Sequence, residues 1–350
     1  MNFWKKLKNK NKPILALAPL AGITDSAQRQ LCKYFGADVL YTEMISSDGL
    51  FYDSKTTLEM LKISKKERPV VLQLFGKDPE KYKKAAKIVE EYGFDGIDIN
   101  FGCPAKKVVA HSGGVSLMRD LDKCREIIKA VLDNTSLPVS VKIRTGINIK
   151  NDSKNSESMV KFDLDKNKRN VITAMDFVEK IKDLPISAIM IHGRTYEQKF
   201  SGEIDNEMIK NIIKFYNEYL GENNRPIILA NGGILSPEDA KKVLKNTGAD
   251  GLGVARGIYG KPFIFKQIRE YLDTGEYKKT DFKLIEKAIL KHAELLFKDK
   301  INKAHLEFRK YLLWYLKGIN NISSLRPDIV SIKSIDDIKN VIKEAKKLNK

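Results

Sequence analysis

The sequence contains few cysteines, and they are scattered along the chain. They are Cys32, Cys103 and Cys124, with no CxxC pair and no cysteine–histidine cluster at zinc-binding spacing. This pattern argues against a disulfide framework and against a structural zinc site. A cytoplasmic setting would keep all three thiols reduced. We therefore expect no metal in this protein.

Long apolar runs are also missing. No stretch reaches the roughly 20 consecutive apolar residues that a membrane-spanning helix needs. The N-terminal segment MNFWKKLKNKNKP is basic but lacks the apolar centre of a signal peptide. We expect a cytoplasmic protein with no membrane partner.

Acidic residues are outnumbered by basic ones. The chain has 63 lysines and arginines against 45 aspartates and glutamates, a formal charge of +18. An AT-rich genome, which favours Lys, Asn and Ile, would explain this excess. A polyanionic partner such as nucleic acid would explain it equally well. Charge alone leaves both explanations open.

Short apolar runs alternate with amphipathic helical segments along most of the chain. Strands buried on both faces give continuous apolar runs, and intervening helices imply parallel pairing. The predicted strands span residues 14–20, 39–44, 70–76, 96–102, 139–146, 188–194, 227–233 and 251–257. Eight strand–helix pairs predict a (β/α)₈ TIM barrel. The alternative is a doubly wound open sheet, but no GxGxxG follows the first strand.

Two helices have clear start and stop signals. Asp78-Pro79 and Ser236-Pro237 place an N-cap before a proline at the first helical position, and Gly93 and Gly248 end the two segments. From about residue 282 the pattern becomes purely helical and rich in lysine. We therefore predict a barrel domain over 1–275 and a helical domain over 276–350. Residues 148–170 are polar and non-periodic, as in a solvated insertion.

Polar or glycine-rich groups follow the ends of the predicted strands, where a TIM barrel carries its chemistry. Any one of them could be a satisfied structural group, but charged residues in buried strands are costly without partners. Lys142, inside VSVKIR, is the clearest case. The set is Pro19, Leu20, Ala21, Gly22, Glu43, Gln73, Asn100, Cys103, Lys142, Arg144, His192, Arg194, Asn231, Gly232, Gly233, Arg256 and Gly257.

The turns ANGGI and GVARG, after the seventh and eighth strands, resemble a phosphate cradle. Their backbone N–H groups and Arg256 could bind a phosphate. Gln73 and Lys142 could bond the polar edge of an isoalloxazine ring, so flavin mononucleotide (FMN) suits the whole set. A different phosphorylated ligand would fit nearly as well.

Cys103 follows a strand end and precedes Pro104, in a stiff loop. Nothing nearby suggests a base for a nucleophile or companions for a metal ligand. A thiol of near-normal pKa above a reduced flavin could instead donate a proton during reduction of a carbon–carbon double bond. The alternative is a small buried hydrophobe, which is our interpretation of Cys32 and Cys124.

The motifs LAPLAGITDSAQRQ, VLQLFG, GIDINFGCPAKKV, VKIRTG, HGRTYEQKFSGEID, ANGGI and GADGLGVARG occur in this order along the barrel. Together they resemble the tRNA-dihydrouridine synthases, and EFRKYLLWYLKG resembles the C-terminal helical domain of that family. The resemblance implies an FMN enzyme that uses NADPH or NADH to reduce uridine in tRNA to 5,6-dihydrouridine. One subunit holds the whole predicted site, so we expect a monomer.

The resemblance also implies roles for individual residues. Cys103 would protonate C5 of the uracil while reduced flavin gives hydride to C6. The predicted flavin contacts are Pro19, Leu20, Ala21, Gln73, Lys142, His192, Asn231, Gly232, Gly233, Ala255 and Arg256. The predicted substrate contacts are Asn100, Lys106, Lys107, Arg144, Arg194, Arg309 and Lys310. The basic residues would bind RNA phosphates while the target uridine is flipped into the barrel mouth.

The chain departs from the family pattern at three positions. Gly233 replaces an acidic residue and Ala255 a glycine, but a backbone N–H survives in both cases. Many members have histidine where this chain has Tyr311, so no RNA contact is assigned there. Two rival functions remain: a dihydroorotate dehydrogenase, which the basic helical tail disfavours, and an RNA-binding barrel without catalysis, which Cys103, Lys142 and His192 disfavour.

Overall fold

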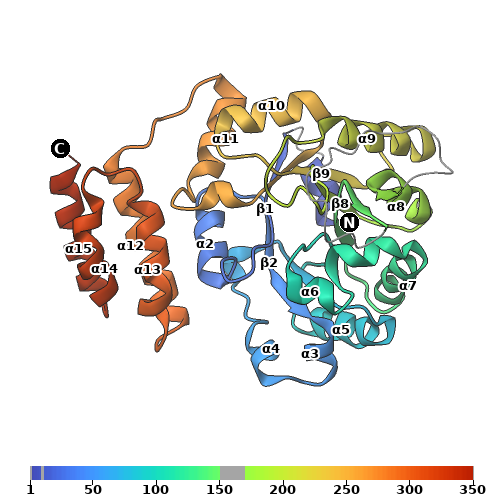
Figure 1. Ribbon diagram of the computed structural model, residues 1–350, viewed down its shortest axis with the longest axis horizontal. Helices are drawn as coiled ribbons and strands as arrows, with labels where there is room; N and C mark the ends of the chain where they lie inside the picture. The colour runs from blue at the N-terminus through green and yellow to red at the C-terminus, as the bar shows by residue number, and fades with distance from the viewer. Residues whose placement is uncertain (1, 9–11, 150–169, 350) are drawn as a thin grey trace.

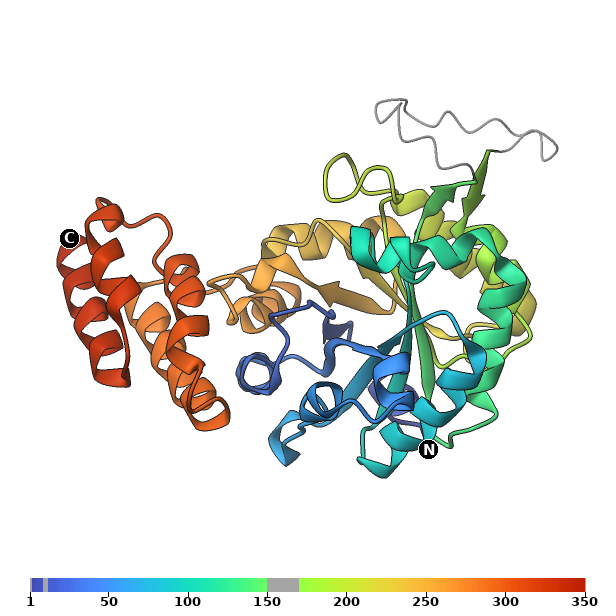
Figure 2. The same cartoon turned by 60° about the horizontal axis from the view of Figure 1, so that its bottom comes forward.

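The structure, a computed structural model, describes residues 2–8, 12–149 and 170–349. Its centre is a closed parallel barrel with strand order β1-β10-β9-β8-β5-β4-β3-β2, surrounded by helices (Figures 1 and 2). The barrel strands are β1 (Ile14–Leu17), β2 (Val39–Ser46), β3 (Val70–Phe75), β4 (Gly96–Phe101), β5 (Val139–Arg144), β8 (Ala188–His192), β9 (Ile227–Asn231) and β10 (Gly251–Val254). All eight predicted strands are confirmed, and with them the TIM-barrel fold class.

The helices of the barrel are α2 (Ser26–Tyr34), α3 (Ser47–Phe51), α4 (Lys55–Glu59), α5 (Pro79–Glu91), α6 (Lys106–Ala110), α7 (Leu121–Leu132), α8 (Ala174–Ile181), α9 (Asn206–Leu220), α10 (Pro237–Thr247) and α11 (Ile264–Thr274), with short 3₁₀ turns η1 (Lys65–Glu67), η2 (Gly114–Arg119) and η4 (Arg256–Ile258). The predicted caps are confirmed. The Asp78 side chain accepts from the Glu80 N–H, and the Ser236 side chain accepts from the Asp239 N–H. Gly248 ends α10 at a φ of 68°.

A short N-terminal helix, α1 (Phe3–Lys8), packs against the barrel interior. Trp4 is almost fully buried among residues at the start of the strands, including Ile14 and Ile227, and its ring lies 6.5 Å from that of Tyr41. The basic composition of this segment had given no sign of a helix. It covers the end of the barrel opposite the strand termini that carry the polar groups.

A two-stranded antiparallel sheet lies beside the barrel, formed by β6 (Gly146–Asn148) and β7 (Val171–Thr173). The insertion predicted over 148–170 falls mainly on residues 150–169, outside the described part of the chain. Asn148, the first residue of the predicted insertion, is the last residue of β6, and the bounds of the insertion stay a prediction.

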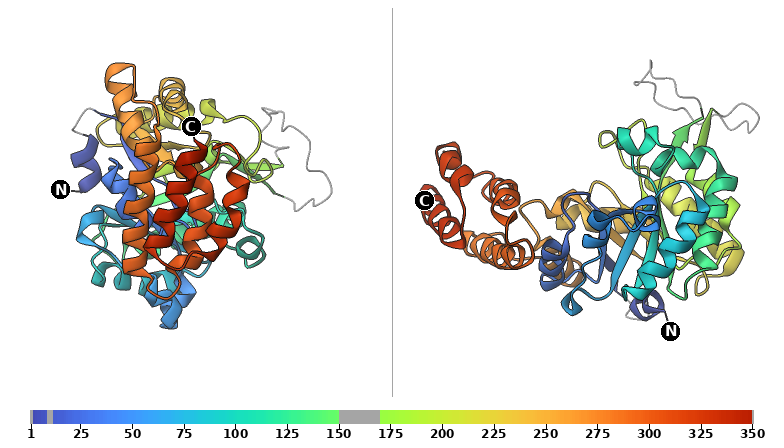
Figure 3. Two further views of the ribbon diagram at one scale, coloured as in Figure 1. Left: turned by 90° about the vertical axis from the view of Figure 1, so that its left-hand side faces the viewer. Right: turned by 90° about the horizontal axis from the view of Figure 1, so that it is seen from below.

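The tail forms a group of helices at one side of the barrel (Figure 3). They are α12 (Phe282–Asp299), α13 (Ala304–Tyr315), α14 (Arg326–Ser331) and α15 (Ile335–Leu348), with the 3₁₀ turn η5 (Ile322–Leu325). α12 packs along α2 of the barrel. Helical periodicity in the sequence covers residues 283–300, 305–318 and 335–348, so α14 was not predicted. The domain division at residue 275, between α11 and α12, stays a prediction. In the described ranges, no helix combines the length and apolarity needed to cross a membrane.

Candidate functional site

A buried polar network lies beneath the barrel mouth, on β3, β4 and β5. The Gln73 Nε2 donates to Asp98 Oδ2 at 2.7 Å, and the Ser140 Oγ donates to Asp98 Oδ1 at 2.6 Å. Burial raises the pKa of Asp98 to about 6, although both hydrogen bonds and the Lys142 charge oppose the rise. Asn100 Nδ2 donates to Gln73 Oε1 at 2.9 Å. The network fixes the Gln73 amide, with its oxygen held toward Asn100.

The loop that carries Cys103 is shaped by Asn100. The Asn100 Oδ1 accepts from the backbone N–H groups of Gly102 and Cys103, at 3.0 and 2.9 Å. Behind it, a Cβ atom at Gly114 would lie 2.8 Å from the Cys103 carbonyl oxygen, which explains the glycine. Burial raises the pKa of the partly exposed Cys103 thiol, and the positive Lys142 and Arg144 offset only part of the rise. The thiol therefore keeps its proton at neutral pH.

Lys142 reaches across the barrel from β5 to β9. Its Nζ donates to Asn231 Oδ1 at 3.1 Å, and Asn231 Nδ2 donates in turn to the Gly253 carbonyl. Burial and the nearby Arg144 lower the pKa of Lys142 to about 8, with Asp98 opposing. His192, at the end of β8, is buried beside these cations, and its pKa falls to about 2. Near neutral pH, His192 is therefore a neutral ring beside the Lys142 ammonium.

The turns after β9 and β10 carry the predicted phosphate-binding groups. Gly232 and Gly233 have φ of 110° and 68°, which favour glycine. A Cβ atom at Gly232 would lie 2.7 Å from His192 Cδ2, so this turn packs directly on the histidine. Half-buried Ala255 precedes η4, whose first residue is the exposed Arg256.

The loop after β8 places an aromatic ring at the mouth. Phe200 is 54% exposed, and its ring centroid lies 6.4 Å from that of His192. The Arg256 guanidinium carbon lies 4.9 Å from the centroid of the Phe200 ring. Sequence reasoning missed this residue; the available signal was one aromatic in the polar run EQKFSG. A flat, exposed ring beside cations is a surface on which a base can stack.

The two arginines predicted to contact the base support this loop. Arg144 is buried and donates to the carbonyls of Gly102, Thr195 and Lys199. Arg194 donates twice to the Gly202 carbonyl, while its buried Nη1 has no partner among the described residues. A direct contact of either arginine with a base stays a prediction.

A family model described as dihydrouridine synthase matches residues 16–349 of this chain. The chain belongs to the dihydrouridine synthase family. It is 34% identical over 331 residues to tRNA-dihydrouridine synthase B of Pseudomonas aeruginosa, covering 92% of this chain and 89% of the relative. It is 35% identical over 319 residues to the protein of the same name from Pseudomonas syringae pv. tomato, covering 89% and 85%.

Among solved structures, 6-hydroxypseudooxynicotine amine oxidase from Pseudomonas geniculata N1 has a TM-score of 0.51 and 13% identity. The match covers 78% of this chain and 48% of the oxidase. It shows a shared fold and nothing about the reaction.

The remaining residues that the dihydrouridine synthase resemblance assigned lie around the mouth and on the tail. Pro19 and Leu20 are half-buried and Ala21 is exposed, in the loop after β1. Lys106 and Lys107 are exposed on α6, directly after the Cys103 loop. The structure therefore brings the predicted flavin contacts and α6 to one end of the barrel.

The predicted RNA contacts on the tail, Arg309 and Lys310, lie on α13 beside Tyr311 and are less exposed than Lys106 and Lys107. The Lys310 Nζ donates to the Gly22 carbonyl at 2.6 Å, and the buried Arg309 Nε has no partner among the described residues. Tyr311, where many dihydrouridine synthases have histidine, is buried and packs on His292 with ring centroids 4.4 Å apart. Position 311 of this chain is therefore part of the helical core.

Proposed function

We propose that this chain is a tRNA-dihydrouridine synthase, reducing the 5,6 double bond of uridine in tRNA. The observation that carries the proposal is a protonated, accessible thiol at a barrel mouth that also holds a buried ammonium and a glycine-rich turn. Membership of the dihydrouridine synthase family and relatives bearing that activity in their names support it.

The residues at the mouth fit FMN. Lys142 uses one of its three N–H donors on Asn231, so the others can bond an anionic or carbonyl-rich ring edge. The glycine turn at 232–233, the Ala255 backbone and Arg256 offer donors suited to a phosphate. Pro19, Leu20 and Ala21 would line the ring. Bound FMN would supply hydride to C6 of the uracil and regain it from NADPH or NADH.

Each polar residue then has a defined task. Cys103 donates the Sγ proton to C5, and solvent returns a proton to the thiolate. Asn100 holds the Cys103 loop through two backbone N–H groups. Neutral His192 can donate a hydrogen bond without competing with Lys142 for an anion. Lys106, Lys107, Arg309 and Lys310 would bind RNA phosphates, as the charge of +18 suggests.

The test uses total tRNA from a strain that lacks this gene. Incubation with the protein, FMN and NADPH should produce dihydrouridine, counted by nucleoside mass spectrometry and mapped to its position. Cys103→Ala should lose this activity by roughly a hundredfold or more, because general acid catalysis contributes about 10²–10⁴-fold. The same variant should still oxidise NADPH. Full uridine reduction by Cys103→Ala would remove the thiol from the mechanism, and a colourless protein that takes up no FMN would remove the cofactor.

A further inference from the structure

The helical domain contacts the loop after β1, residues 19–25, which is expected to line the flavin. The Lys310 Nζ donates to the Gly22 carbonyl at 2.6 Å, and the Tyr311 hydroxyl approaches the Ile23 carbonyl at 3.5 Å. Lys300, between α12 and α13, donates to Asp25 Oδ2 at 2.8 Å and to Glu307 Oε2 at 2.7 Å. The Gly22–Asp25 part of this loop therefore contacts side chains from the tail.

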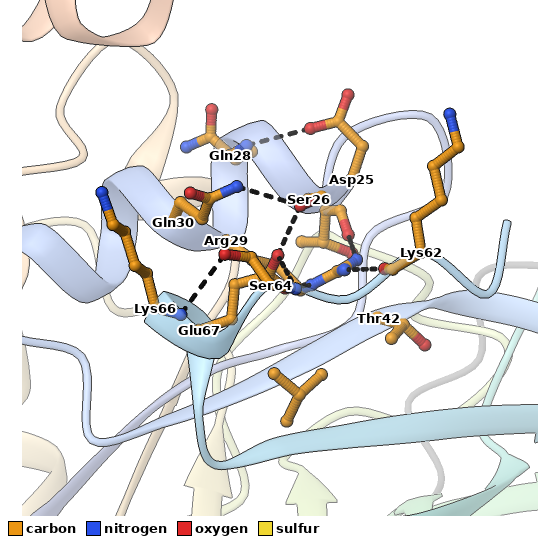
Figure 4. A network of polar contacts seen from close by, with 12 residues as sticks. Asp25, Ser26, Gln28, Arg29, Gln30, Thr42, Lys62, Ser64, Lys66 and Glu67 are labelled. Carbon is orange, nitrogen blue, oxygen red and sulfur yellow. Dashed lines mark hydrogen bonds and ion pairs between the residues drawn. The ribbon is translucent and has the colours of Figure 1, made fainter. Parts of the chain in front are cut away.

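The same part of the loop is also held from within the barrel, where it leads into α2 (Figure 4). The buried Arg29 donates to Glu67 Oε2 at 2.6 Å and to the Thr24 carbonyl at 2.8 Å. The Ser26 hydroxyl also donates to Glu67. Asp25 caps α2 by accepting from the Gln28 N–H at 2.9 Å. The barrel therefore holds the Thr24 carbonyl and Asp25 Oδ1, whereas the tail holds Asp25 Oδ2 and the carbonyls of Gly22 and Ile23.

Asp25 needs its partner from the tail because it is buried. Its exposed fraction is 7%, and Lys300 is only partly exposed. Burial alone would lower the pKa of Lys300, but the Asp25 and Glu307 carboxylates outweigh it and raise that pKa. Removal of one partner of a buried pair leaves the other charge uncompensated, which costs more than the pair itself contributes.

α13 also contacts the second loop that is expected to bind the flavin. Tyr259, directly after η4, stacks on Trp314 with ring centroids 4.1 Å apart and planes within 4°. The next residue, Gly260, has a φ of 68°, and a Cβ atom there would lie 2.2 Å from the Trp314 carbonyl oxygen. The backbones therefore touch at this point. No side chain larger than glycine's hydrogen fits.

We propose that α13 and the turn before it position the two loops expected to bind the flavin, the loop after β1 (residues 19–25) and the loop after β10 (residues 255–260). Lys300 and Trp314 are the positioning residues. This inference rests on the proposed FMN site. It makes the helical domain part of the cofactor site and not only an RNA-binding attachment. FMN affinity should then depend on contacts of the tail even when no RNA is present.

The experiment measures FMN affinity of the full chain without RNA, by quenching of flavin fluorescence. Lys300→Met and Trp314→Leu should raise the FMN Kd roughly fivefold or more, the lower end of typical coupling between sites. The conservative variants Lys300→Arg and Trp314→Phe should keep most of the wild-type FMN affinity. Lys303→Met is the matched control, since Lys303 is exposed on the same turn. Its FMN Kd should stay at the wild-type value.

A second control separates positioning from loss of stability. Ile342→Ala removes buried side-chain volume in α15, away from both loops, so it should lower the Tm and leave the FMN Kd unchanged. The bound flavin's visible circular dichroism should change in the Lys300 and Trp314 variants alone.

The outcomes separate this inference from the proposed function. Unchanged FMN affinity in both Lys300→Met and Trp314→Leu, with a raised KM for tRNA, would overturn it and leave the tail an RNA-binding role only. An FMN Kd raised as much by Ile342→Ala would also overturn it. If Lys300→Met does not fold, Trp314→Leu decides alone. Failure of the wild-type chain to bind FMN would refute the proposed function instead.

Discussion

Burial decides which ionisable side chains at the barrel mouth carry charge near neutral pH. It keeps Cys103 protonated and His192 neutral, since the charged forms of both are disfavoured away from water. Lys142 remains largely protonated at neutral pH, with a pKa of about 8. The site therefore combines a proton donor with one nearby ammonium. This arrangement suits the proposed FMN ring and the proposed protonation of a uracil carbon.

The pKa of Lys142 predicts a pH dependence of cofactor binding. The ammonium is present below about pH 8 and lost above it, so FMN affinity of the apo protein should fall as pH rises through that value. A charge-assisted hydrogen bond contributes about 1.5–3 kcal/mol, so Lys142→Met should weaken FMN binding roughly tenfold or more below pH 8. Fluorescence titrations on both sides of pH 8 measure this.

A loss of protein stability above pH 8 cannot explain the expected fall in FMN affinity. The unfolded chain keeps the Lys142 proton up to its ordinary pKa, so between about pH 8 and that value it binds more protons than the folded chain. Stability from this group therefore rises with pH while FMN affinity falls. Lys245→Met, at an exposed lysine in the last turn of α10, is the control and should retain the wild-type profile. An unchanged pH profile in Lys142→Met would assign the titration to another group.

The polar residues at strand ends could be recognised as site candidates from the sequence. The side chains that contact them in the fold could not. Gln73 and Lys142 stand out because polar groups interrupt apolar strands. Asp98 was overlooked, since its hydrogen bond to Ser140 depends on the register that pairs β4 with β5. Phe200 was overlooked because its position near His192 depends on how a long loop folds back.

At the scale of elements, the barrel was predictable because each strand is buried on both faces and gives an apolar run. The elements missed were short: α1, α14, β6 and β7. A helix of six residues shows less than two turns of periodicity, and its stability comes from packing on the rest of the protein. α1 forms because Trp4 fills the base of the barrel.

The burial of Trp4 predicts a large effect on stability alone. Trp4→Ala should lower the free energy of unfolding by about 3–5 kcal/mol, the usual cost of truncating a buried aromatic. Urea denaturation followed by circular dichroism measures this. FMN affinity in the absence of urea should stay unchanged, because α1 lies at the opposite end of the barrel. Lys5→Ala, at the exposed neighbouring position, should leave both quantities as in the wild type.

At the scale of the whole molecule, the direction of the barrel separates its lysines into two groups. Parallel strands all end at the mouth, so a helix begins near the mouth and ends near the base. Lys106 and Lys107 start α6, directly after β4, and lie at the mouth. Lys245, in the last turn of α10, lies at the base. Composition alone could not separate these groups, although the fold does.

This division predicts which lysines bind tRNA. A phosphate contact releases condensed counterions, so the logarithm of the tRNA affinity should fall linearly with the logarithm of the salt concentration. Lys106→Ala and Lys107→Ala should each weaken tRNA binding and reduce the slope by about one. Lys245→Ala removes the same charge from the base and should leave the slope unchanged. Equal effects of all three substitutions, in filter binding over a salt series, would mean that the net charge of +18 attracts RNA without a defined contact surface.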